Sequence, residues 1–193
     1  MSRHATSFVL GYHGCLRSTA DDVVAGRTEL AHSDRDYDWL GAGAYFWESD
    51  VQRAQEWAQH RFGADGAVIG AVIDLRNCLD LVSRFDLELV REAHPRFLKF
   101  CTDTGTEAPV NSNVRNDPNG DVLLRRLDCA VINFLNRSMD ASPDIESFDT
   151  VRGMFLEGGP LYEGSAIREK NHVQIAVRNN DVIKGFFFPR QPA

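Results

Sequence analysis

Two short segments of this chain combine residue types that suit the binding of a flat, partly polar ligand. Segment 11–15 reads Gly-Tyr-His-Gly-Cys and follows an apolar run, so a histidine and a glycine arrive where a strand should end. Glycine at such a point lets a backbone approach a ligand closely. Segment 38–48 reads Asp-Trp-Leu-Gly-Ala-Gly-Ala-Tyr-Phe-Trp-Glu, a glycine-rich turn that opens onto aromatic residues. Because an aromatic face holds a planar ring and excludes water, the two segments predict a ring-binding site.

The order of these motifs resembles the ADP-ribosyltransferase superfamily. It runs His-Gly, then Leu-Gly-x-Gly-x-Tyr-Phe, then a helix that contains alanines, over roughly residues 7–62 with a late strand near 174. The branch concerned carries a signature of His, Tyr and a third residue, usually Glu, and the chain is most similar to compact bacterial toxin-like mono-ADP-ribosyltransferases. The resemblance implies an α+β fold with a split mixed or antiparallel sheet that clasps NAD, flanking helices and a helical insertion at about 80–140.

The resemblance also implies roles for particular residues. His13 binds a ribose hydroxyl, Gly14 pairs its backbone with the nicotinamide amide, and Tyr45 stacks on the nicotinamide ring. Since successive residues of a strand point to opposite faces, Trp47 shares the face of Tyr45 and is a second stacking candidate, whereas Phe46 points away. The implied NAD-binding set is Tyr12, His13, Gly14, Gly41, Gly43, Tyr45 and Trp47.

The third signature position departs from the usual pattern. On the predicted strand His172–Val177 the residue in register is Gln174, where the family has Glu. A glutamine carbonyl accepts a hydrogen bond from a hydroxyl but cannot serve as a general base. Three interpretations stay open: a nearby acid (Glu157, Glu163 or Glu169) supplies the base, the acceptor needs none, or the protein binds NAD without turnover. Among the acids we favour Glu157 as a catalytic residue, because it leads into a flexible Gly158-Gly159 loop.

The loop from Gly158 to His172 is the candidate target-recognition segment, because binding residues concentrate on loops beside a rigid scaffold. Ser165 and Arg168 are its candidate contacts.

Cleavage of the nicotinamide–ribose bond passes through an oxocarbenium-like state, so the protein must hold nicotinamide and stabilise positive charge on the ribose. The resemblance therefore predicts an enzyme that transfers ADP-ribose from NAD to protein, RNA or DNA. It implies a toxin or phage-defence effector with a cognate antitoxin or immunity protein. The alternatives are an NAD glycohydrolase and a non-catalytic module that binds NAD or ADP-ribose.

Composition bounds these interpretations. The chain has 193 residues, enough for one domain (1–193) with its own core, and a formal charge of −7 that argues against a generally basic nucleic-acid-binding surface. Its four cysteines are widely spaced, which predicts neither a metal site nor a disulfide framework, but reduced buried thiols. Neither a leader sequence nor a membrane span is recognisable, so we expect a cytoplasmic protein without membrane contacts.

Hydrophobic patterns predict the elements that position the candidate residues. We expect a first strand over 7–12, a helix capped by Ser18 and ended by Gly26, and a helix over 49–62 capped by Ser49 or Asp50. The apolar, β-branched segment 67–75 predicts a strand in the middle of the sheet.

The middle and the end of the chain differ in character. Helical spacing appears over 85–100 and 120–135, with an exposed mobile loop over 102–119 between them. Strands are expected over 153–157, 172–178 and 182–188, and Asn179-Asn180-Asp181 predicts a hairpin turn between the last two.

Overall fold

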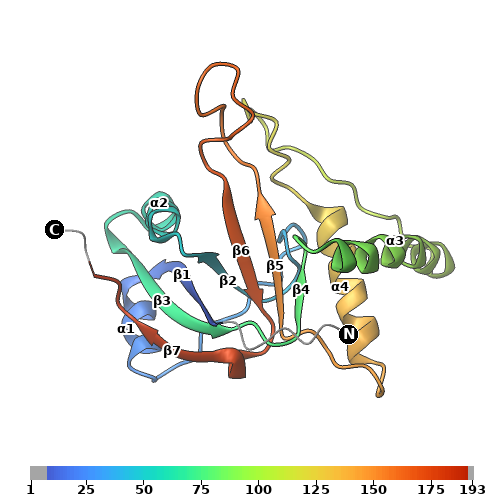
Figure 1. Ribbon diagram of the computed structural model, residues 1–193, viewed down its shortest axis with the longest axis horizontal. Helices are drawn as coiled ribbons and strands as arrows, with labels where there is room; N and C mark the ends of the chain where they lie inside the picture. The colour runs from blue at the N-terminus through green and yellow to red at the C-terminus, as the bar shows by residue number, and fades with distance from the viewer. Residues whose placement is uncertain (1–7, 191–193) are drawn as a thin grey trace.

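The computed structural model of this protein describes residues 8–190, so Ser7, the first residue of the predicted opening strand, lies outside the described part. Within that part the strands form a seven-stranded sheet in the order β4-β5-β6-β2-β1-β3-β7 (Figure 1). The strands are β1 (Phe8–Leu16), β2 (Ala44–Glu48), β3 (Gly66–Asp74), β4 (Cys78–Asp80), β5 (Thr150–Phe155), β6 (His172–Val177) and β7 (Ile183–Phe187). β4 and β5 are parallel and the other neighbours are antiparallel, which confirms the α+β class.

Four helices flank this sheet within residues 8–190: α1 (Arg17–Val24), α2 (Val51–Phe62), α3 (Arg84–Thr104) and α4 (Arg126–Asp140). α1 and α2 pack on β1 and β3, on the left in Figure 1, whereas α3 and α4 pack together beside β4 on the right. Cys15 lies in the core with α1, and its neighbour Gly14 lies against α2. Because adjacent strand residues face opposite ways, α1 and α2 cover opposite faces of β1.

The sheet is nearly divided in two between β1 and β2. Their ladder consists of Gly11↔Glu48 and Tyr12↔Trp47, whereas β1 pairs with β3 along its whole length. Beyond Tyr12, Ser33 takes the place of β1 and pairs with Gly43, the residue before β2, through backbone hydrogen bonds of 2.8 and 3.0 Å. The interruption therefore falls at His13 and Gly14, between two half-sheets that are each continuous.

The helix after β2 forms as its sequence predicts. Asp50 is the N-cap, and its carboxylate accepts a hydrogen bond from the backbone N–H of Arg53. The buried residues Ala54 and Ala58 face the sheet. A side chain on Gly14 would meet the Ala54 carbonyl oxygen at 2.8 Å, so the close approach of α2 to β1 requires glycine there.

The predicted hairpin between the last two strands is wrong. Residues Asn180–Val182 form a 3₁₀ turn, after which the chain crosses to the far edge of the sheet, where β7 pairs with β3. β6 instead lies between β5 and β2. The Asn179 side chain binds Asp149 at 2.7 Å and accepts from the Asp181 N–H, so it holds the chain to β5 rather than closing a hairpin.

Several predicted boundaries also need correction. Ser18 is not a cap, because α1 already begins at Arg17 and Leu16 stands at its N-cap. The helix expected from 120 begins at Arg126, and residues 102–104 belong to α3 rather than to the following loop. β3 lies inside the sheet between β1 and β7, not at its centre, and β5 ends two residues before Glu157.

Residues 156–171, which we call the arm, connect β5 to β6 and project from the sheet at the top of Figure 1. The segment between α3 and α4 runs up beside the arm in that view. Asp121 in this segment accepts a hydrogen bond from the Gly158 N–H at 3.0 Å. The chain between β4 and β5 therefore supplies both α3 and α4 and a support for the arm.

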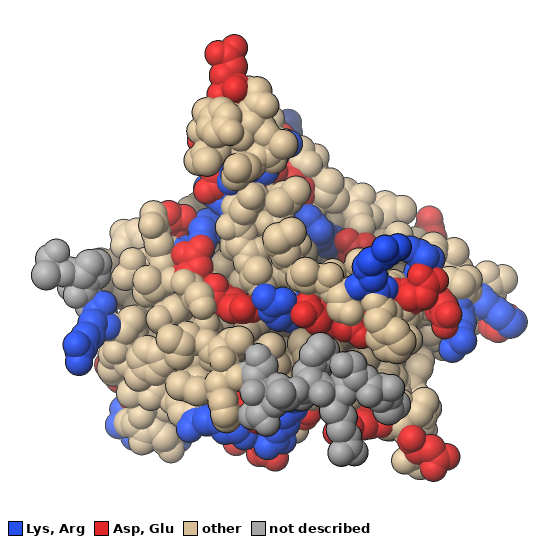
Figure 2. Space-filling view, viewed as in Figure 1, with Lys and Arg blue, Asp and Glu red and all other residues tan. Residues whose placement is uncertain are grey.

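Charged groups are mixed rather than segregated on the face shown in Figure 2, where acidic and basic side chains alternate in a band across the middle. Among the ion pairs of the sheet, Arg152 on β5 binds Glu48 at 2.6 Å and Asp80 at 3.2 Å. The four cysteines are free, as predicted; Cys15, Cys101 and Cys129 are buried, whereas Cys78, also predicted to be buried, is only partly so. Over residues 8–190, no helix is both long and apolar enough to cross a bilayer.

Candidate functional site

His13 connects the two half-sheets where their ladder stops. Its Nδ1 lies 2.7 Å from the Tyr45 carbonyl oxygen. A carbonyl only accepts, so Nδ1 carries the proton and Nε2 presents a lone pair. Burial lowers the pKa of His13 below its usual 6.5, so the imidazole is neutral at pH 7. His13 is thus a neutral acceptor, suited to a hydroxyl, and Nε2 has no hydrogen-bond partner among residues 8–190.

The Tyr45 side chain is held by the glycine-rich turn that precedes it. Its hydroxyl donates to the Gly41 carbonyl at 2.7 Å and accepts from the Leu40 N–H at 2.8 Å. Burial raises the pKa of this hydroxyl strongly. Tyr45 therefore offers a ring face but no free hydroxyl to a ligand.

Strand alternation around Tyr45 is as predicted. Phe46 is fully buried in the cluster below α1, whereas Tyr45 packs with the cluster around Leu40 on the other face. The His13 ring lies 5.8 Å from the Phe46 ring, so His13 and Tyr45 project from opposite faces and meet only through the Tyr45 backbone. A ligand that touched both side chains would have to lie in the interruption between β1 and β2.

A row of candidate residues crosses both half-sheets on the face of Tyr45. Tyr12 on β1 pairs with Trp47 on β2, and Trp47 pairs with Gln174 on β6. The Trp47 Nε1–H is buried without a partner, and the Gln174 amide makes no hydrogen bond within residues 8–190. Gly153, the next residue in the row, has no side chain, and a Cβ there would meet Leu40 at 2.9 Å. The row thus brings unpartnered polar groups together beside an aromatic ring.

The glycines of the candidate site have packing roles of their own. A Cβ on Gly41, whose φ is +79°, would meet the Asn133 side chain at 2.6 Å. A Cβ on Gly43 would meet the Val177 carbonyl at 2.8 Å, and Gly14 lies against α2. We expected these glycines to let the backbone approach a ligand closely. In the structure they instead let segments of the protein itself approach one another.

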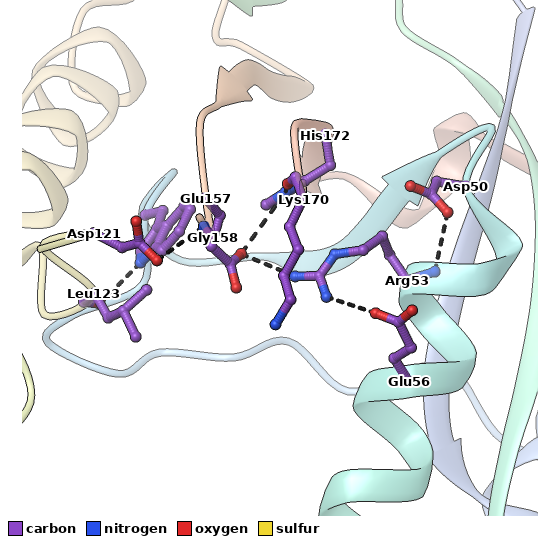
Figure 3. A network of polar contacts seen from close by, with 10 residues as sticks. Asp50, Arg53, Glu56, Asp121, Leu123, Glu157, Gly158, Lys170 and His172 are labelled. Carbon is purple, nitrogen blue, oxygen red and sulfur yellow. Dashed lines mark hydrogen bonds and ion pairs between the residues drawn. The ribbon is translucent and has the colours of Figure 1, made fainter. Parts of the chain in front are cut away.

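Glu157 belongs to a network that ties the arm to α2 (Figure 3). Its carboxylate lies 2.9 Å from the Arg53 guanidinium, and Arg53 also binds Glu56 at 3.0 Å. Nδ1 of His172 lies 3.8 Å from the same carboxylate and 2.7 Å from the Lys170 carbonyl. Both side chains of the Arg53–Glu157 pair are largely buried, at 15% and 18% exposure, so this pair fixes the base of the arm.

Beside Glu157, an arginine side chain lies over a group of packed aromatic rings. The rings of Trp39 and His172 stack at 6.0 Å, and Arg125 lies 4.4 Å above Trp39 and 5.0 Å above Phe155. Burial lowers the pKa of His172, so this histidine is also neutral at pH 7. Trp39 donates its indole N–H to the Leu123 carbonyl, which fastens the segment before α4 to the stack.

The predicted target contacts lie within the arm. Ser165 accepts a hydrogen bond from the Ile167 N–H at 3.0 Å, and Arg168 reaches the Gly158 carbonyl at 3.5 Å. The structure therefore brings Gln174, Trp47 and Tyr12 into one row, with Glu157 at the adjoining base of the arm, and leaves Ser165 and Arg168 farther out.

Two residues that the sequence analysis did not assign to the site border this row. The ring of Trp57 on α2 lies 6.1 Å from the ring of Trp47, tilted by 51°, and Trp57 is 38% exposed. Arg53 holds Glu157, and no local sequence pattern connects residues 104 positions apart. The sequence therefore held no signal that could have identified Arg53 as the partner of Glu157.

Among the described residues, no group of three or more His, Cys, Asp or Glu side chains could hold a metal ion. No protein-family model matches this chain, and neither the curated proteins nor the solved structures give a significant match.

Proposed function

We propose that this protein is an ADP-ribosyltransferase that cleaves NAD and transfers ADP-ribose to a macromolecular acceptor, as a toxin or defence effector inside a bacterial cell. The observation that carries the proposal is the interruption of the sheet at His13. There the ladder between β1 and β2 stops, and a neutral imidazole, whose Nε2 has no partner within the described residues, lies beside the Tyr45 backbone. The resemblance to ADP-ribosyltransferases implies a split sheet and a histidine that binds a ribose hydroxyl, and this arrangement supports both.

In the proposed reaction the bond between ribose C1′ and the nicotinamide nitrogen breaks, and nicotinamide leaves with the electron pair. A nucleophile of the acceptor then bonds to C1′ and loses its proton. His13 Nε2 accepts a hydrogen bond from a ribose hydroxyl, and the faces of Tyr45 and Trp47 hold the nicotinamide ring and exclude water. Gln174 orients the ribose through its amide but cannot take the proton.

Glu157 is the proposed acceptor of that proton. It is the acid of the arm that is fixed at the edge of the site, by Arg53 at 2.9 Å, so its geometry is defined before an acceptor binds. Replacement by Gln should keep a hydrogen bond to Arg53 while removing the base. We expect transfer to fall and NAD binding to persist; unchanged transfer would assign the base elsewhere.

The composition of the arm favours a protein acceptor. Leu161, Tyr162 and Ile167 are all more than half exposed, and the arm has three glutamates against one arginine and one lysine. A nucleic-acid-binding loop would instead need cations for the phosphates. Serine at positions 161 and 162 should reduce transfer without slowing cleavage of NAD in the absence of acceptor.

The experiment that tests the function is nicotinamide release from NAD by the purified protein, alone and with the protein or nucleic-acid fraction of a lysate. Release that depends on one fraction supports transfer and identifies the acceptor class. Release without either fraction supports an NAD glycohydrolase. Tight NAD binding without release supports a non-catalytic module, which the neutral, unpartnered Gln174 favours; Gln174→Glu should then create activity.

A further inference from the structure

The base of the arm is closed by backbone hydrogen bonds between its two ends. The Lys170 N–H donates to the Glu157 carbonyl at 3.0 Å. In the next pair along the arm, the Glu169 N–H donates to the Gly159 carbonyl, also at 3.0 Å. His172 is the first residue of β6 and lies where the arm rejoins the sheet (Figure 3), with its side chain at 0% exposure. A change in the position of the His172 ring therefore acts directly on the base of the arm.

The two ring nitrogens of His172 have unequal surroundings. Nδ1 lies 2.7 Å from the Lys170 carbonyl oxygen, and because a carbonyl only accepts, Nδ1 carries the proton of the neutral ring. Nε2 is buried and has no hydrogen-bond partner within residues 8–190. A second proton would therefore go to Nε2, where it would create a charged donor that is shielded from water and has no acceptor. Such a buried, unpaired donor is strongly unfavourable.

Neighbouring charges do not compensate for that second proton. The charged side chains around His172 belong to the arm, to the start of α2 and to the segment before α4, whose arginine lies beyond the aromatic rings: Glu157, Lys170, Asp50, Arg53 and Arg125. Glu157 lies 3.8 Å from Nδ1, but its carboxylate already binds Arg53 at 2.9 Å. Burial outweighs the two acids and lowers the pKa of His172 below its usual 6.5. The charged ring is therefore more stable in water than in its enclosed position.

We propose that protonation of His172 releases the base of the arm, so that the arm is fixed on the sheet at neutral pH and opens in acid. Outward rotation of the charged ring would bring Nε2 to water and break the bond from Nδ1 to the Lys170 carbonyl. The ring would also leave Trp39, whose ring lies 6.0 Å from it. Opening then separates Lys170 from Glu157 at the base of the arm. The inference concerns the position of the arm, so it stands whether or not the protein cleaves NAD.

The test is amide hydrogen exchange of the full chain, followed by NMR at the Lys170 amide and corrected for the pH dependence of intrinsic exchange. In the open arm His172 takes up a proton with its ordinary pKa of about 6.5. The opening equilibrium should therefore rise by up to about tenfold per pH unit below 6.5, or roughly 30-fold from pH 7 to pH 5. The ladder between β1 and β3 should stay protected over the same range, which separates opening of the arm from global unfolding.

Two variants and one titration complete the test. His172→Phe keeps an aromatic ring beside Trp39 and Phe155 but cannot titrate, so exchange at Lys170 should become independent of pH. The matched control is His60→Phe, at an exposed position of α2, which should keep the wild-type pH dependence. NMR titration of the His172 ring in the wild type needs no variant, and its midpoint should lie below pH 6.5. The proposal would be overturned by arm exchange that does not change between pH 7 and pH 5, by equal pH dependence in His172→Phe, or by a His172 midpoint at or above the ordinary value of about 6.5.

Discussion

Substitutions at His13 can test its two ring nitrogens independently, because the two have different roles in the structure. Nδ1 donates to the Tyr45 carbonyl at 2.7 Å, and Nε2, which has no hydrogen-bond partner among residues 8–190, can accept from a ligand. In His13→Asn the amide nitrogen stands near the position of Nδ1, but nothing replaces Nε2. In His13→Gln the amide oxygen reaches the position of Nε2, but the donor to Tyr45 is lost.

The expected size of each effect is that of one hydrogen bond: the bond to Tyr45 for stability, and the bond to ribose for activity. A net hydrogen bond contributes about 0.5–1.5 kcal/mol, so His13→Asn should be more stable than His13→Ala by about 1 kcal/mol, since both lose the ring contact with Phe46. Loss of the acceptor to ribose should lower kcat/KM for NAD cleavage about tenfold in His13→Asn, because about 1.4 kcal/mol corresponds to tenfold. His13→Gln should retain more activity than His13→Asn and be less stable.

Urea unfolding followed by tryptophan fluorescence measures the stabilities, and nicotinamide release measures the activity. Two results would refute the reasoning. One is equal stability of His13→Asn and His13→Ala, which would mean that the hydrogen bond to Tyr45 does not stabilise the protein. The other is NAD cleavage by His13→Asn at the wild-type rate, which would mean that Nε2 takes no part in binding the ribose.

Three further outcomes are expected. Gly14→Ala brings a methyl group to 2.8 Å from the Ala54 carbonyl and should cost about 1–3 kcal/mol in urea unfolding, whereas Gly185→Ala, with nothing within 4 Å, should change stability by less than about 0.5 kcal/mol; equal losses would contradict the packing argument. Tyr45→Phe strands the Leu40 N–H and the Gly41 carbonyl and should cost about 1–3 kcal/mol, against a small loss for Tyr12→Phe, whose hydroxyl has no partner in residues 8–190. Because burial lowers the pKa of both His13 and His172, the unfolded chain binds more protons below pH 6.5, and the free energy of unfolding should fall as the pH drops from 6.5, by up to about 1.4 kcal/mol per unit for each histidine; a flat profile between pH 7 and 5 would contradict this.

Local patterns in the sequence determined the elements around the site. The Asp50 cap, the buried face of α2 and the alternation of Tyr45, Phe46 and Trp47 depend on spacings of a few residues, which the sequence shows directly. The same holds for the α+β class, because apolar runs of strand length and helical stripes are both visible in the chain.

Tertiary structure alone decided which elements meet. Nothing local distinguishes a hairpin after Asn179 from a crossing to β3, since the choice depends on which strand edge is vacant. The Arg53–Glu157 pair joins residues 104 positions apart, and the hydrogen bond from the Ala42 N–H to the Asn133 side chain forms only when α4 packs beside the turn before β2. The sequence therefore determined the candidate residues and their local geometry, whereas long-range packing determined their partners, because a side chain's burial and hydrogen bonds depend on neighbours that sequence spacing does not specify.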